Sequence, residues 1–131
     1  MTRRQLRENI FLLLFRSEFH APADMPEQFE LFREELEQAN EADKAYITAK
    51  ADAVMDLTPQ IDQAIDAAAE RWKTARMGKV ELTLLRLAYY EIHYDDDIPT
   101  SVAIDEAVEL AKKYGQDGAG AFVNAILAKV V

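Results

Sequence analysis

Apolar residues recur every three or four positions along most of this chain, and that spacing constrains its fold more than any other feature. The two clearest examples are Ile104, Ala107, Val108, Ala111 and Tyr114, followed by Phe122, Val123, Ile126, Leu127 and Val130. This spacing places the apolar side chains on one face of an α-helix, where they can pack against a neighbouring element. Both segments are therefore predicted to be amphipathic helices, and the chain as a whole is predicted to be all-α.

Capping residues and breaks divide the pattern into about seven helices. The helices expected before residue 76 cover about 2–19, 26–40, 42–56 and a segment that opens at residues 58–59. Thr2 suits the N-cap of the first of these helices. Thr58 and Pro59 suit the N-cap and the first residue of the fourth, which is expected to carry Trp72 on its inward face. A fifth helix starts near Val80 and should lie centrally, because it is apolar over most of its circumference.

The length and composition favour a single globular domain, 1–131. With 131 residues the chain is long enough to bury a sizeable core. It has no cysteine, which excludes disulfides and cysteine metal sites. The apolar run from Ile10 to Phe15 is shorter than the roughly 18 residues of a membrane span and than the ~7 residues of a signal-peptide core. A cytoplasmic protein is therefore expected.

The net charge of -9 is distributed unevenly along the chain. The net charge is +3 over residues 1–16, -11 over 17–70, +3 over 71–94 and -4 over 95–131. A protein with this asymmetry can hold a polyanion at its basic regions while its acidic regions repel nonspecific RNA or meet a basic partner. The alternative is that the acidic helices only maintain solubility.

Three arginines near the N-terminus share a helix face with aromatic residues. At about 100° per residue, Arg3, Arg4 and Arg7 fall on one arc that is continued by Phe11 and Phe15. Guanidinium groups bind phosphates and stack on bases, and aromatic rings offer further stacking surfaces. RNA binding is one interpretation of this face. The other is that the arginines are solvated and bind nothing, and charge alone favours this second interpretation.

An ordered series of motifs runs through the C-terminal half of the chain. It consists of Leu85-Arg86-x-Ala88-x-Tyr90-Glu91, then Pro99, the run from Val102 to Lys112, and Phe122-Val123-Asn124 with Ile126-Leu127. This series resembles the NusB family of transcription antitermination factors, and Trp72 with Arg76 extends the resemblance toward the N-terminus. The resemblance implies a NusB-like fold of two small helical subdomains, about 1–75 and 76–131, divided near residues 74–78.

The resemblance also implies a function, which is binding to the boxA sequence of nascent ribosomal RNA leaders together with NusE, a small-subunit ribosomal protein. The resulting complex would join RNA polymerase with other Nus factors and suppress premature termination. This mechanism is equilibrium binding, in which phosphate contacts hold the RNA strand and base contacts read it.

The functional residues that the resemblance implies are spread along the chain. Those implied to bind RNA are Arg3, Arg4, Arg7, Phe122 and Asn124, and Phe15 is added to them because it continues the arginine face of the first helix. Glu81 falls where the family meets its basic protein partner. Stacking by Phe122 and hydrogen bonds from Asn124 would give sequence preference, although core packing is an equal alternative for Phe122. The chain departs from the family pattern at Gly118 and Ala125, which bears on the fine RNA contacts.

No pattern in the sequence indicates catalysis, a cofactor or a metal. His20 and His93 lie far apart and lack the H-x-x-x-H spacing of a metal site. The glycines from 115 to 120 have the order G-x-x-G-x-G, which is not a dinucleotide fingerprint. The acidic segment 95–106 has Thr100 where a calcium loop requires glycine. A binding protein is therefore expected, with a protein-interaction scaffold or homodimer without RNA binding, and an uncharacterised enzyme, as the alternatives.

Overall fold

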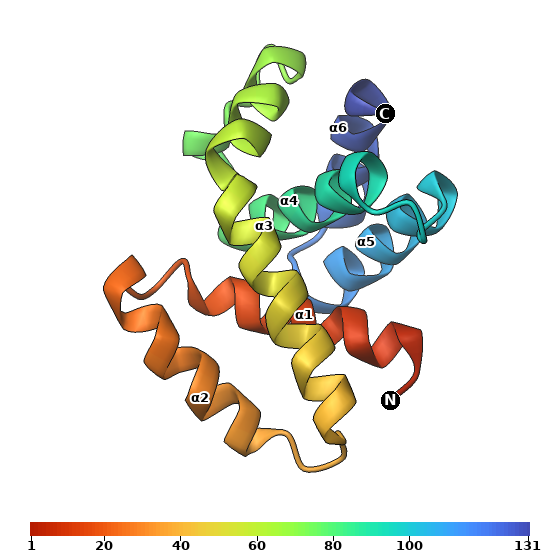
Figure 1. Ribbon diagram of the computed structural model, residues 1–131. Helices are drawn as coiled ribbons and strands as arrows, with labels where there is room; N and C mark the ends of the chain where they lie inside the picture. Colours follow the sequence, from red (N-terminus) through yellow and green to blue (C-terminus); the bar gives the residue numbers. More distant parts are fainter. The chain divides into compact units, whose positions relative to one another are not determined.

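The protein is all-helical, as the sequence predicts. The computed structural model describes residues 1–131 and contains six α-helices and two short 3-10 helices (Figure 1). In chain order they are α1 (Arg3–Arg16), η1 (Pro22–Asp24), α2 (Met25–Glu35), α3 (Glu41–Ala68), η2 (Thr74–Arg76), α4 (Lys79–Tyr94), α5 (Thr100–Tyr114) and α6 (Ala119–Val130). None of these helices combines the length and the apolar character needed to cross a membrane.

The prediction of about seven helices is wrong by one, because the expected third and fourth helices are a single helix, α3. Pro59 lies inside α3 instead of opening a new helix. A proline in a helix interior removes one hydrogen bond and costs about 3 kcal/mol. However, the buried stripe of α3 continues past residue 59 without a change of spacing, and its members are Ile47, Ala51, Val54, Ile61 and Ile65. Burial of this stripe on both sides of Pro59 offsets the lost hydrogen bond.

The chain forms two compact units, Met1–Met55 and Asp56–Val131. The first contains α1, η1, α2 and the first part of α3, and the second contains the remainder. Residues 74–78, where the sequence places a subdomain boundary, lie within the second unit. They form η2 and the short link to α4. A structural division at that segment stays a prediction.

The core of the first unit is aromatic and aliphatic. Its buried apolar side chains on α1 and α2 are Ile10, Phe11, Leu13, Leu14, Met25 and Phe32. The rings of Phe11 and Phe15 have centroids 5.7 Å apart, and those of Phe15 and Phe19 are 5.0 Å apart. Arg16 joins α1 to α2, because it forms an ion pair with Glu35 and its guanidinium lies 5.0 Å from the centre of the Phe32 ring.

The second unit is organised around α4, which packs against both α5 and α6. Its buried side chains on these three helices include Leu84, Leu85, Leu87, Ala88, Ala103, Ala107, Ala111, Val123, Ile126 and Leu127. Arg86 links α4 to α3 through two hydrogen bonds, from Nε and Nη2 to the Asp62 carboxylate, each 2.8 Å long. The predicted central position of the helix that starts near Val80 agrees with these contacts.

Candidate functional site

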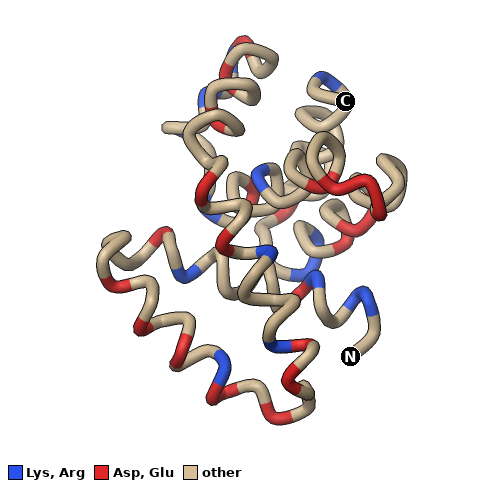
Figure 2. Tube along the Cα trace, viewed as in Figure 1, with Lys and Arg blue, Asp and Glu red and all other residues tan.

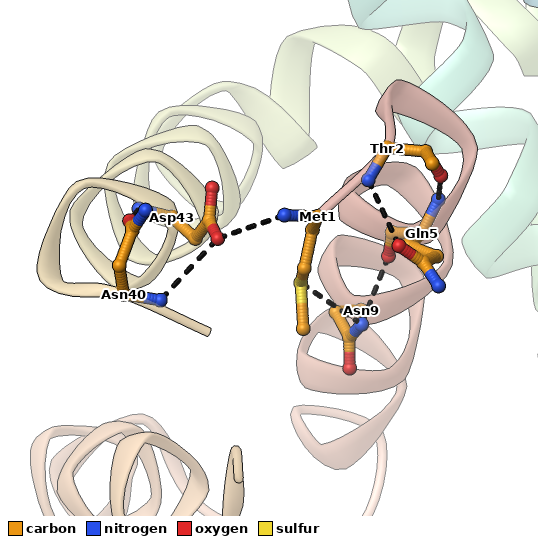
Figure 3. Close-up of polar contacts among 6 residues, drawn as sticks. All are labelled: Met1, Thr2, Gln5, Asn9, Asn40 and Asp43. Atoms are coloured by element: carbon orange, nitrogen blue, oxygen red, sulfur yellow. Dashed lines mark hydrogen bonds and ion pairs between the residues drawn. The ribbon is translucent and has the colours of Figure 1, made fainter. Parts of the chain in front are cut away.

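The first turn of α1 is held by a set of polar contacts (Figure 3). The Thr2 hydroxyl accepts a hydrogen bond of 3.1 Å from the Gln5 backbone N–H, and the Thr2 N–H donates one of 2.8 Å to the Gln5 side chain. This reciprocal pair is a capping box, so the prediction of Thr2 as the N-cap is confirmed. The amino group of Met1 also donates to the Asp43 carboxylate on α3, at 3.0 Å. These contacts orient the turn that carries Arg3 and Arg4.

The basic residues at the start of α1 differ in exposure. Arg3 and Arg4 are exposed, while only 8% of Arg7 is accessible. Phe15 is half-buried within the ring series of the first unit. The charges of that unit are segregated, with basic residues at the start of α1 and mostly acidic residues along α2 (Figure 2). Phosphate binding by Arg3 and Arg4 is therefore compatible with their position, whereas a contact by Arg7 stays a prediction that its burial does not favour.

We expect replacement of Thr2 with alanine to lower the free energy of unfolding by about 1 kcal/mol, because the alanine cannot accept the hydrogen bond from the Gln5 N–H. Serine at the same position keeps a hydroxyl and is the matched control. Urea denaturation of both variants measures the change, and amide exchange measures the opening of the first turn. Equal stability of the alanine and serine variants would show that the hydroxyl contributes nothing.

Phe122 and Asn124 lie on α6 but do not form one surface. Phe122 is half-buried and Asn124 is exposed. Residues two positions apart are rotated by about 200° about the helix axis, so their side chains point to nearly opposite sides of the helix. A single base therefore cannot stack on Phe122 and be hydrogen-bonded by Asn124 at the same point of α6. The assignment of both residues as RNA contacts stays a prediction, and it requires two separate points of contact.

Phe122 instead meets an aromatic residue that the sequence placed in the core. Its ring packs edge-on against the ring of Trp72, with centroids 5.8 Å apart and an interplanar angle of 89°. Trp72 is 57% exposed, so the prediction that it faces inward on a helix is wrong. The physical reason is that α3 ends at Ala68, and Glu70 then adopts a positive φ of 35° that turns the chain. The helical periodicity therefore no longer applies at residue 72.

The turn that carries Trp72 is fixed by hydrogen bonds. The Trp72 N–H donates to the Ala69 carbonyl at 2.8 Å. The Asp66 carboxylate accepts bonds from the Thr74 N–H at 2.6 Å and from the Thr74 hydroxyl at 3.0 Å. Lys73 donates from Nζ to the Asp66 backbone carbonyl at 2.8 Å. These bonds on either side of Trp72 hold its backbone in place while the indole stays exposed.

The segment from Arg71 to Lys79, which contains Trp72, is basic, although the exposed Glu70 precedes it directly. Residues 71–79 contain four exposed basic side chains and no acidic one, and the basic residues are Arg71, Lys73, Arg76 and Lys79. We call Trp72, Phe122 and the two basic residues that directly flank the tryptophan, Arg71 and Lys73, the Trp72 patch. The sequence signal that could have identified it is an arginine and a lysine directly flanking the tryptophan, since basic residues beside an aromatic residue are typical of surfaces that bind nucleic acid.

A second aromatic cluster, partly exposed and at the end of α4, lies next to acidic residues. The rings of Tyr90 and Tyr94 are stacked with centroids 5.7 Å apart, and those of Tyr89 and His93 are 4.2 Å apart. Burial raises the pKa of Tyr89 above its ordinary value, and the nearby Tyr94 raises it further. Three consecutive acidic residues, 95–97, follow Tyr94 directly. This cluster is therefore a poor surface for a polyanion.

Glu81 lies in the first turn of α4, where a carboxylate interacts favourably with the helix dipole. Its side chain lies against Gly78, where a Cβ atom would overlap with Oε2 of Glu81, and near Gly115. Glu81 is partly exposed. Partner binding by Glu81 stays a prediction.

No group of three or more His, Asp or Glu side chains is placed to hold a metal ion.

Comparison with known proteins identifies relatives over the whole chain. The NusB family model matches residues 4–131. Transcription antitermination protein NusB of Agathobacter rectalis is 51% identical over 98% of both chains, and that of Lachnoclostridium phytofermentans is 46% identical over 100% of this chain and 99% of the relative. The fold is similar to that of T. maritima NusB, with a TM-score of 0.89, 34% identity and coverage of 99% and 90% of the two chains. It is also similar to a chain in the crystal structure of antitermination factors NusB and NusE in complex with dsRNA, with a TM-score of 0.83, 27% identity and coverage of 99% and 97%.

Proposed function

The chain belongs to the NusB family, and on this premise we propose that it is an RNA-binding transcription antitermination factor. It binds the boxA element of nascent ribosomal RNA leader transcripts together with NusE, and the complex acts with RNA polymerase and other Nus factors to suppress premature termination. The observation that carries this proposal is the full-length similarity to relatives named as antitermination proteins, one of them crystallised with NusE and RNA. It acts by binding, without a catalytic step.

The exposed arginines of α1 supply the electrostatic part of the binding. Arg3 and Arg4 lie in a turn whose orientation is held by the capping box and by the Met1 contact to Asp43. Because that turn is already ordered, little conformational entropy is lost when the guanidinium groups bind phosphates. Phosphate contacts fix the position of the strand but read no sequence.

The second unit supplies base contacts and the protein contact. An aromatic ring at Phe122 and an exposed amide at Asn124 are groups that stack on unpaired bases or hydrogen-bond their edges. The partly exposed Glu81 carboxylate faces the basic protein partner. Each unit thus contributes a different kind of contact, and the acidic surfaces elsewhere limit nonspecific binding of RNA.

The test is fluorescence anisotropy with a labelled boxA-type single-stranded RNA and a scrambled RNA of equal length. Both RNAs are titrated across a salt series with and without NusE. We expect the boxA-type RNA to bind more tightly than the scrambled RNA, and NusE to increase this preference. Equal or absent binding of the two RNAs in the presence of NusE would overturn the proposal and favour a protein-interaction scaffold or homodimer.

A further inference from the structure

We propose that Trp72, supported by Phe122, is a stacking platform for one unpaired base of the bound RNA. The inference rests on the proposed function and deepens it, because it adds to the RNA-binding surface a residue that the sequence alone predicted to be part of the core. The contact is sequence-tolerant, since every base presents a π-face that can stack on an indole.

The exposure of Trp72 is the first observation that supports this role. More than half of the residue, 57%, is accessible, although burying a tryptophan is strongly favourable. The Asp66 bonds to Lys73 and Thr74 and the bond from Trp72 to Ala69 fix the backbone around it. A large aromatic side chain held at the surface by an ordered turn can bind a ligand ring at low entropic cost.

The geometry of the ring pair leaves an indole face available. The Trp72 and Phe122 rings are perpendicular, at 89°. In such a pair the edge of one ring meets the face of the other. If the phenyl edge meets the indole, Phe122 covers one indole face; if the indole edge meets the phenyl face, it covers neither. In both arrangements at least one indole face is not covered by Phe122, and Phe122 restricts the orientation of the indole.

The charge around Trp72 indicates a polyanionic ligand. Arg71 and Lys73 are its direct neighbours, and the whole of residues 71–79 contains no acidic residue. An exposed aromatic group among basic residues is the combination that single-stranded nucleic acid requires, because the rings stack on bases while the cations contact phosphates. Tyr94 provides the contrast, since it is 48% exposed but precedes three consecutive acidic residues. Exposure is similar at the two sites, but Trp72 has a basic residue on each side, and of the two acidic residues before it, Glu70 and Asp66, the second is hydrogen-bonded to Thr74.

Intrinsic fluorescence tests the proposal directly, because Trp72 is the only tryptophan of the chain. The intact protein is titrated with unlabelled boxA-type RNA in the presence of NusE while tryptophan emission is recorded. A titration of NusE alone corrects for any emission that NusE contributes. We expect quenching that saturates at the same RNA concentration as the anisotropy signal. RNAs carrying one abasic nucleotide at successive positions identify the stacked base, because quenching is lost at that position only.

Substitutions separate stacking from charge. We expect Trp72→Ala to weaken boxA-type RNA binding about 10-fold, within the range for loss of one stacked base, with an unchanged salt slope because no charge is removed. Trp72→Phe should retain most of the affinity. Tyr94→Ala, the matched control of an exposed aromatic residue in the same unit, should bind like wild type. Circular dichroism checks that each variant is folded.

The possible outcomes distinguish this inference from the proposed function. If the wild-type protein prefers boxA-type RNA but its fluorescence is unchanged and Trp72→Ala binds normally, the stacking role is wrong and the proposed function stands. If a glutamate-rich peptide quenches Trp72 and the RNA does not, the patch binds an acidic protein instead. If the wild-type protein shows no RNA preference with NusE, both proposals are wrong. The quenching measurement uses the wild-type chain, so it decides the question even if Trp72→Ala is unstable.

Discussion

Replacing Arg86 with alanine is expected to lower the free energy of unfolding by about 3 kcal/mol. Arg86 donates two hydrogen bonds of 2.8 Å to Asp62, and the two side chains are only 16% and 24% exposed. Two parallel bonds between a guanidinium and a carboxylate are stronger and more directional than a single contact. Removing the arginine leaves the Asp62 carboxylate partly buried without this cation, so the cost exceeds that of a surface ion pair.

Urea denaturation measures this change as a lower midpoint with an unchanged slope. Arg86→Lys is the informative companion, because it retains the charge but cannot form two parallel bonds, and it should recover less than half of the loss. A double-mutant cycle with Asp62→Ala isolates the pair from the loss of packing around the arginine stem. A coupling energy below about 0.5 kcal/mol would place this pair in the class of weak surface ion pairs.

Replacing Arg3 and Arg4 together with alanine is expected to reduce the salt dependence of RNA binding. Each phosphate contact to single-stranded RNA contributes about 0.7 to the slope of log K against log salt, so losing two contacts should lower the slope by about 1.4. The electrostatic contribution to binding vanishes near 1 M salt. From that reference, a slope lower by this amount means about 25-fold weaker RNA binding at 0.1 M salt. Arg7 is left unchanged because it is buried, and its replacement would also perturb packing.

The matched control is the replacement of both Lys112 and Lys113 with alanine. These lysines are exposed on α5, and their removal lowers the net charge by the same amount. Anisotropy titrations of both double variants over the same salt series give the two slopes. The arginine variant should show the smaller slope, and the lysine variant should resemble wild type. Equal reductions would mean that net charge alone is responsible, and that Arg3 and Arg4 form no specific phosphate contacts.

Part of the candidate site was predictable because it depends on local chemistry. The capping role of Thr2 follows from a hydroxyl placed before a helix and a glutamine three residues later. The exposure of Arg3 and Arg4 follows from the same local position, at the first turn of a terminal helix. The Trp72 patch was not predictable in this way, because the indole is exposed only through the end of α3 at Ala68 and the turn that follows.

The sequence by itself determined the all-helical class, the N-cap of α1 and the family, because periodicity, capping and ordered motifs are local properties of the chain. Tertiary structure decided that α3 continues through Pro59, that Arg7 is buried and that Trp72 meets Phe122 at the surface. Those three outcomes depend on packing between residues that are distant in sequence. The free energy gained by burying an apolar stripe can exceed the cost of a proline inside the helix. The helical spacing of apolar residues no longer predicts burial beyond the end of the helix.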